Sequence, residues 1–166
     1  MKFSPLLELK NQSLLKSIYQ FAKKRKKKLY LVGGILRDIL LNRDKENLDI
    51  DFCLKEGAIS FGNSLAKGIK TGFVVLDKTR GACRLVKKIK DRVYTLDFTD
   101  FRGKTLEEDL LHRDFTINAL SIGLEKVFQE QNLENFLIDP YKGSQDLKSK
   151  VIRLVNKKGF DEDPLR

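Results

Sequence analysis

The sequence of 166 residues lacks several features that would place it in particular protein classes. It has no tryptophan, one histidine (His112) and two cysteines (Cys53 and Cys83). A single histidine excludes a metal site built from several histidines. Two cysteines without metal-ligand spacing form neither a zinc site nor a disulfide framework. Both are therefore expected to be reduced packing residues in a cytoplasmic protein.

Long apolar runs are also missing. No run approaches the ~20 residues that a membrane-spanning helix needs, and the first five residues contain no apolar signal core. We therefore expect no membrane partner. The length suggests one domain, or one domain with a small appendage.

Acidic residues are scarce relative to basic ones. Lys and Arg number 33 and Asp and Glu 23, which gives a net charge of +10. Such an excess attracts polyanions, chiefly nucleic acid or an anionic membrane, although solubility alone would also explain it. Six consecutive basic residues, 23–28, end a helix predicted for residues 11–24. We expect these residues to form a solvated face of the protein, and contact with RNA phosphates is the alternative.

Alternating and helical spacings of apolar residues predict a mixture of strands and helices. The predicted strands cover residues 29–32, 48–54, 72–76, 82–89, 93–98, 136–138 and 151–155, and the predicted helices cover residues 35–41 and 58–69. A capping-box pattern begins a further helix at Thr105. Residues 114–123 are predicted as helix and then strand, residues 128–135 as a loop, and Gly143 as a turn.

Two carboxylates on one strand form the sharpest local signal. Asp49 and Asp51 alternate with apolar residues, so they share one face of the predicted strand. Like charges held this close are unfavourable, and a divalent cation such as Mg²⁺ relieves the repulsion. Asp97, on a later strand, is a candidate third carboxylate. A solvated strand face is the simpler interpretation of each.

A glycine pair between a strand and a helix forms the second signal. Gly33 and Gly34 permit a close approach of backbone amides to a phosphate, and Arg37 lies one helical turn further on. A tight turn without a ligand would have the same sequence. The order of the two signals favours a triphosphate and its metal in one cleft.

Four ordered blocks resemble the CCA-adding enzymes and bacterial poly(A) polymerases, the class II tRNA nucleotidyltransferase family. The resemblance covers residues from about 29 to the end. The blocks are residues 31–38 with 48–52 (LVGGILRD and LDIDF), residues 109–119 (DLLHRDFTINA), residues 138–147 (IDP with Gly143, Asp146 and Leu147), and residues 160–166 (FDEDPLR). His112 departs from the pattern, because it replaces the first arginine of the usual pair in the second block.

The resemblance implies an α/β (α+β) fold, the DNA polymerase beta-like nucleotidyltransferase fold with a mixed sheet flanked by helices. It implies the head domain at 29–155 and the start of a neck domain at 156–166, whereas the N-terminal helix and basic run at 1–28 match nothing distinctive in the family. Such a truncated chain, or stand-alone head, is expected to be weakly active alone. The family continues with neck, body and tail helices.

The resemblance also implies a role for each site residue. Asp49, Asp51 and Asp97 would bind two Mg²⁺ ions, or Mn²⁺, for attack of an RNA 3′-hydroxyl on the α-phosphate of ATP or CTP. The residues expected to bind the nucleotide are Gly33, Gly34, Arg37, Arg113, Asp114 and Asn118, and those expected to read its base are Asp163 and Arg166. For Asn118 a purely structural role is equally open.

Addition of C, A or both to tRNA 3′ ends is the preferred function. Blocks between residues 76 and 103 resemble bacterial members that divide the work between CC-adding and A-adding enzymes. The alternatives are a poly(A) polymerase acting on general RNA 3′ ends, a non-catalytic RNA-binding module and, more remotely, a sugar or antibiotic nucleotidyltransferase. The sequence leaves the oligomeric state open.

Overall fold

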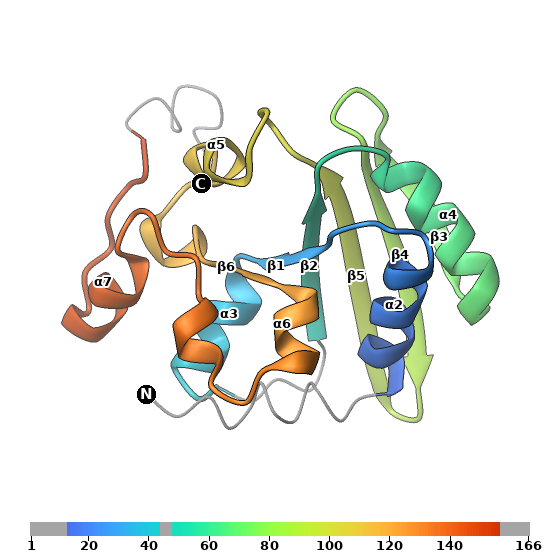
Figure 1. Cartoon of the computed structure of the whole chain (residues 1–166), viewed down its shortest axis with the longest axis horizontal. Coiled ribbons are helices and arrows are strands. Elements are labelled where there is room, and N and C mark those ends of the chain that lie inside the picture. Colours follow the sequence, from blue (N-terminus) through green and yellow to red (C-terminus); the bar gives the residue numbers. More distant parts are fainter. Residues whose placement is uncertain (1–12, 44–47, 157–166) are drawn as a thin grey trace.

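One mixed sheet forms the centre of the molecule in the computed structural model, which describes residues 13–43 and 48–156. The strand order is β3-β4-β5-β2-β1-β6 (Figure 1). The central pair β2 and β5 is parallel, and the other neighbouring pairs are antiparallel. The strands are β1 (Tyr30–Val32), β2 (Leu48–Leu54), β3 (Gly72–Asp77), β4 (Ala82–Ile89), β5 (Arg92–Asp100) and β6 (Ser121–Gly123).

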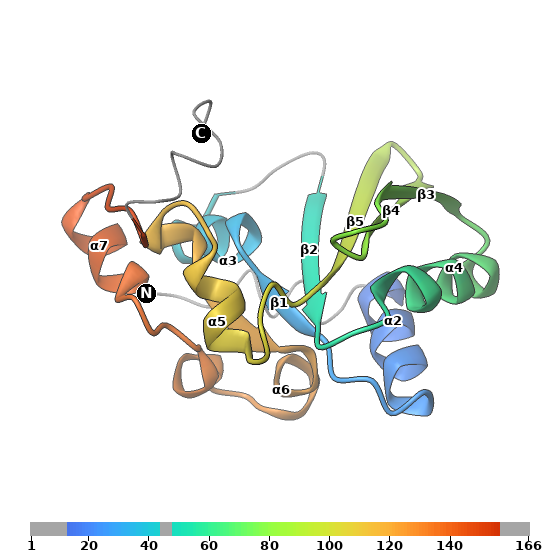
Figure 2. The same cartoon turned by 90° about the horizontal axis from the view of Figure 1, so that it is seen from above.

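Helices flank this sheet, so the structure has the mixed sheet and flanking helices that the resemblance implied. The α-helices are α2 (Ser13–Lys24), α3 (Gly34–Leu40), α4 (Ala58–Ile69), α5 (Leu106–Leu111), α6 (Leu124–Gln129) and α7 (Gly143–Ser149), and the short 3-10 turns are η1 (Thr116–Asn118) and η2 (Leu133–Phe136). Helices α2 and α4 lie side by side at the end of the sheet that holds β3 to β5, whereas α5 and α7 lie toward the other end (Figure 2).

The two faces of β2 and β5 have different chemistry. Phe52 and Phe98 are fully buried, and their rings stack with centroids 4.8 Å apart. Burial of each such side chain contributes about 1.5–3 kcal/mol to stability. Alternation then places Asp51 and Asp97 on the opposite face. The predicted strand 48–54 is confirmed at both ends, as is the helix at 58–69.

The last third of the chain differs from the sequence-based expectation. The predicted loop at 128–135 overlaps α6 and η2, because Val127 and Leu133 are buried in the core despite the polar residues around them. The predicted strands at 136–138 and 151–155 are wrong: each segment makes only an isolated bridge, Ile138 with Ser121 and Leu154 with Phe115. Gly143 begins α7 rather than a simple turn.

The predicted helix start at Thr105 and the predicted packing role of the two cysteines are confirmed. Thr105 is the N-cap of α5, and its side chain accepts a hydrogen bond from the backbone N–H of Glu108 at 3.2 Å. Cys53 and Cys83 are both free and buried, and burial raises the pKa of the Cys83 thiol to about 12. Within residues 13–43 and 48–156, no helix combines the length and apolar character that crossing a membrane requires.

Candidate active site

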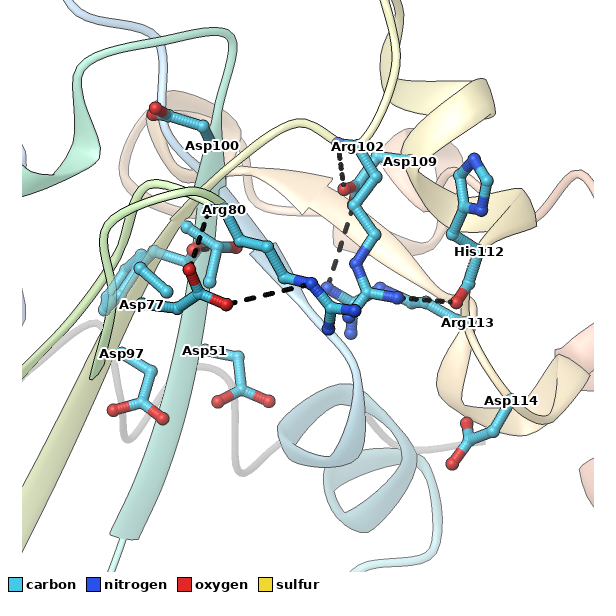
Figure 3. A pocket seen from close by; sticks show the side chains of 13 residues that line it. Asp51, Asp77, Arg80, Asp97, Asp100, Arg102, Asp109, His112, Arg113 and Asp114 are labelled. Atoms are coloured by element: carbon cyan, nitrogen blue, oxygen red, sulfur yellow. Dashed lines mark hydrogen bonds and ion pairs between the residues drawn. The ribbon is translucent and has the colours of Figure 1, made fainter. Parts of the chain in front are cut away.

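Two of the predicted catalytic carboxylates lie on neighbouring parallel strands. Asp51 on β2 is in register with Asp97 on β5, and their side chains project the same way (Figure 3). Asp49 lies two residues earlier on the same face of β2. Burial is the largest cause that raises the pKa of Asp51; Asp97 and Asp49 raise it further, while Arg113 lowers it. The three carboxylates are therefore electrostatically coupled.

An arginine that the sequence reasoning missed neutralises Asp97. Arg84 on β4 is in register with Asp97, and its Nε and Nη2 each donate a hydrogen bond of 2.7 Å to one carboxylate oxygen. These hydrogen bonds are the main reason why the pKa of Arg84 is raised. Its position on the face of Asp97 follows from strand alternation, but the pairing requires the β4–β5 register.

The glycine turn between β1 and α3 packs directly against the carboxylates. Gly33 has a φ of +76°, which favours glycine, and a Cβ there would lie 2.8 Å from Arg113 Nη1 and 3.2 Å from Asp51 Oδ2. Its own N–H donates to the carbonyl of Leu120 at 3.2 Å. The Cβ of a residue replacing Gly34 would lie 3.3 Å from Arg37 Nη2. The close packing at Gly33 joins the turn to the catalytic strand.

Three predicted nucleotide-binding residues form one hydrogen-bonded chain. Arg37 Nη1 donates to Asn118 Oδ1 at 2.6 Å, and Asn118 Nδ2 donates to Asp114 Oδ1 at 3.1 Å. Arg37 Nε also donates to Asp38 Oδ1 at 3.0 Å. Asn118 therefore links the first sequence block, through Arg37, to the second block rather than acting only within its own turn.

Arg113 lies in a partly buried setting beside Asp109. Its Nη2 is 3.8 Å from Asp109 Oδ2, and its buried Nε has no hydrogen-bond partner within the described part of the chain. The backbone N–H of Arg102 donates to Asp109 Oδ1 at 3.0 Å, and Arg102 Nη1 donates to the carbonyl of His112 at 3.1 Å. The Arg113 guanidinium thus retains capacity to donate to an anion.

A cavity of about 390 Å³ opens over these groups (Figure 3). Its lining includes four predicted site residues, Asp51, Asp97, Arg113 and Asp114. It also includes residues that were not predicted as site residues, among them Asp77, Arg80, Asp100, Arg102 and Asp109. Asp100 Oδ1 accepts a hydrogen bond of 2.7 Å from Ala58 N at the start of α4, so this carboxylate already has a structural partner.

The remaining predicted residues fall outside this lining. Gly33 packs against Arg113 and Asp51, which line the cavity. Arg37 is joined to the lining residue Asp114 through the hydrogen bonds of Asn118. Asp49 shares the strand face of Asp51 but does not line the cavity. Asp163 and Arg166 lie outside the described residues.

The donor set fits Mg²⁺ or Mn²⁺. Among the described residues, no group of three or more His, Cys, Asp or Glu side chains is already arranged to hold a metal ion, and Arg84 occupies both oxygens of Asp97. Carboxylate oxygens are the ligands that such hard cations prefer. Burial is the main cause of the raised pKa of Asp51, and a cation beside it would relieve the smaller repulsion from Asp97 and Asp49.

Comparisons with known proteins agree on one family. Residues 29–153 match the family described as "Poly A polymerase head domain". The chain is 40% identical over 136 residues to a CC-adding tRNA nucleotidyltransferase of Synechocystis, covering 82% of this chain and 30% of that protein. An A-adding tRNA nucleotidyltransferase of Aquifex aeolicus is 37% identical over 153 residues, covering 82% and 17%. The chain thus spans less than a third of either relative.

Solved structures give the same result at the level of the fold. A tRNA nucleotidyltransferase complexed with a primer tRNA and an incoming ATP analogue matches with a TM-score of 0.68 and 36% identity, over 89% of this chain and 41% of that one. A CCA-adding enzyme in complex with ATP matches with a TM-score of 0.76 and 29% identity, over 99% and 39%.

Proposed function

Because this chain belongs to the poly(A) polymerase head-domain family, whose members here include class II tRNA nucleotidyltransferases, we propose that it transfers C or A from a nucleoside triphosphate to the 3′ end of tRNA. The observation that supports this most directly is the register of Asp51 with Asp97 over a cavity that Arg113 also lines. Carboxylates for cations and a guanidinium for a phosphate meet there, as phosphoryl transfer requires.

In this proposal each residue has a separate task. Asp49, Asp51 and Asp97 would hold two Mg²⁺ ions, whose chemistry is activation of the 3′-hydroxyl and neutralisation of the leaving pyrophosphate. Arg113 and Arg37 bind triphosphate oxygens by charge-assisted hydrogen bonds. Asn118 and Asp114 hold Arg37 in place through the hydrogen bonds described above. Fixed donors of this kind lower the barrier mainly by positioning and electrostatics.

The tRNA 3′ end is preferred over a general RNA 3′ end as the substrate. The relatives at 36–40% identity include CC-adding and A-adding tRNA nucleotidyltransferases and a multifunctional CCA protein. Transfer of C, of A or of both therefore stays open in this proposal. A poly(A) polymerase would use RNA without tRNA structure equally well. An RNA-binding module without catalysis would have no use for the coupled carboxylates of Asp51 and Asp97, which are partly buried.

The test is incorporation of labelled CTP and ATP, each alone, onto tRNA that ends before C, C or A, with Mg²⁺ present. We expect Asp49→Ala/Asp51→Ala to abolish incorporation, a loss of about 100-fold or more, because the cation site loses two ligands. Asp91→Ala/Glu134→Ala is the matched control, since both residues are exposed and lie away from the cavity. The nucleotide used would distinguish CC, A and CCA addition.

Absence of incorporation by the wild-type chain on every primer would reject the proposal. Binding of RNA without turnover, and without any response to Mg²⁺ or Mn²⁺, would then support the RNA-binding module. Equal use of unstructured RNA and tRNA would instead support the poly(A) polymerase.

A further inference from the structure

A basic surface lies at the end of α2, apart from the carboxylates. Four lysines of the run (Lys23, Lys26, Lys27 and Lys28) line a hollow of about 320 Å³ together with Tyr19, Tyr30 and Gln129. Lys26, Lys27 and Lys28 also line a second hollow of about 350 Å³, together with Lys55 and Phe101. We call Lys23, Lys26, Lys27, Lys28 and Lys55 the basic ridge. The acidic residues that line these hollows are Glu125 and Glu56.

The fold holds this ridge in a defined position. Lys26, which follows the end of α2 by two residues, has a φ of +54°, and Lys27 N donates to the carbonyl of Ala22 at 3.0 Å. Lys27 Nζ donates to the carbonyl of Glu56 at 3.1 Å, which ties the segment to the end of β2. By contrast, the side chains of Lys23, Lys26 and Lys28 are exposed and make no hydrogen bond or ion pair to the other described residues. Their charges are available to a ligand.

The ridge adjoins the catalytic cavity at one end of the central strands. Lys55 directly follows β2, and Phe101 directly follows β5, with Phe101 N donating to the carbonyl of Leu54 at 2.9 Å. The neighbours of Phe101 on either side, Asp100 and Arg102, line the catalytic cavity. The link from α2 to β1 passes beside this end of the sheet (Figure 1). A polymer whose end lies in the cavity can therefore continue onto the ridge.

The chemistry of the ridge fits RNA better than a membrane surface. A helix that lies on a membrane exposes an apolar face, whereas Leu14, Leu15 and Ile18 of α2 are buried in the core. No exposed large hydrophobic residue of the described part lies in the ridge. Exposed lysines around these hollows instead offer phosphate contacts, as in the positively charged grooves that bind single-stranded nucleic acid.

We propose that the basic ridge binds the sugar–phosphate backbone of the RNA substrate upstream of the 3′ end that enters the cavity. The proposal rests on the proposed function for the position of the 3′ end. It assigns to the lysine run a role that the sequence pattern left open. Binding at the ridge supplies affinity without base specificity, since phosphate contacts position a nucleic acid and do not read its sequence.

The experiment compares two triple variants of the full chain with equal loss of charge. Lys23→Gln/Lys26→Gln/Lys28→Gln alters the ridge, and Lys67→Gln/Lys148→Gln/Lys150→Gln alters exposed lysines on α4 and at the end of α7. Each triple includes one lysine with positive φ, Lys26 or Lys150, so the backbone conditions match. The probe is fluorescein-labelled tRNA lacking CCA, and the readout is the Kd from anisotropy over a series of KCl concentrations.

We expect the ridge variant to raise the Kd about tenfold at low salt and to lower the slope of log K against log [KCl] by about 2 to 3, since each lost phosphate contact removes about 0.7 to 0.9. The control variant should change neither appreciably. A primer too short to extend from the cavity to the basic ridge should be elongated at the same rate by both variants.

Three results would overturn the ridge proposal. Equal weakening by both triples would mean that net charge alone determines binding. Unchanged tRNA binding by the ridge variant would exclude the ridge as a contact. Loss of binding to phosphatidylcholine–phosphatidylserine vesicles, with tRNA binding intact, would identify a membrane surface instead. Absence of incorporation by the wild type would reject the proposed function, while the tRNA Kd values would still decide the ridge.

Discussion

Asp51 combines burial with two neighbouring carboxylates, and both raise its pKa. A raised pKa in the folded state means that the protonated form is favoured there. The stabilisation of the fold by the protonated Asp51 carboxyl is fully present below the ordinary pKa of 3.8. It is lost as pH rises through the raised pKa of the folded state. At neutral pH and without metal, the ionised carboxylate therefore lowers the stability of the fold.

Asp51→Asn should consequently stabilise the metal-free chain while it abolishes nucleotide transfer. We expect a gain of about 1 kcal/mol at neutral pH in EDTA, which corresponds to roughly 2–4 °C in Tm for a chain of this size. The gain should disappear in acid, because wild-type Asp51 is then protonated as well. Thermal unfolding followed by circular dichroism at both pH values measures it. A Tm unchanged or lowered at neutral pH would contradict this account.

The sequence could predict part of the site because the relevant residues are close together along the chain. Asp49 and Asp51 are set by strand alternation, and Gly33 by the change from strand to helix. The contact between Arg84 and Asp97 depends instead on the β4–β5 register. The link from Arg37 to Asn118 spans 81 residues. Neither contact leaves a local pattern, so the structure was needed to find both.

At the scale of elements, the position of α7 determines that of the turn carrying Asn118. Thr116 Oγ1 donates to the buried Asp146 Oδ2 at 2.7 Å, and Arg153 Nε is 3.1 Å from the same oxygen. Arg153, through its hydrogen bonds, is the largest cause that lowers the pKa of Asp146. Gly143, at the start of α7, packs so closely that a Cβ would overlap the carbonyl oxygen of Thr116.

Gly143→Ala should therefore displace η1 and weaken nucleotide binding. We expect a loss of about 1–3 kcal/mol in unfolding free energy and a KM for nucleotide raised more than kcat is lowered. Gly68→Ala is the control, because a Cβ there is in ordinary contact, 3.9 Å from Phe21 Cε2. It should be neutral or slightly stabilising. Urea unfolding and initial rates measure both effects, and a normal KM in a folded Gly143→Ala variant would refute the coupling.

Elements with regular apolar spacing were predictable, and those set by tertiary contacts were not. Strand β2 and helix α4 have clear periods and buried faces, so their predicted bounds are confirmed. Helix α6 and turn η2 are short, and mostly polar residues surround the buried Val127 and Leu133. Residues 151–155 read as a strand because of their β-branched residues, yet the structure gives them no extended partner strand.

At the scale of the whole molecule, the sheet carries the proposed catalytic carboxylates, whereas Arg37 on α3 and Arg113 after α5 are proposed to bind the triphosphate. Base selection is assigned to Asp163 and Arg166, which lie outside the described residues. The chain spans 30% of the Synechocystis relative, so most of that protein lies outside the matched region. Asp163 and Arg166 are the residues expected to hydrogen-bond the base edge. Their function requires a fixed position relative to the cavity.

Fusion of neck helices of the kind that the family resemblance implies should therefore lower the KM for CTP or ATP and raise kcat, together about tenfold or more in kcat/KM, because those helices would fix Asp163 and Arg166. The measurement is single-nucleotide incorporation by the chain with and without the fused segment. In the fused protein, Asp163→Ala/Arg166→Ala should remove discrimination between CTP and ATP and largely retain triphosphate binding through Arg37 and Arg113. Comparable kinetics for both lengths would show instead that the sheet and its cavity select the nucleotide, and base selection would then have to be sought among the cavity residues.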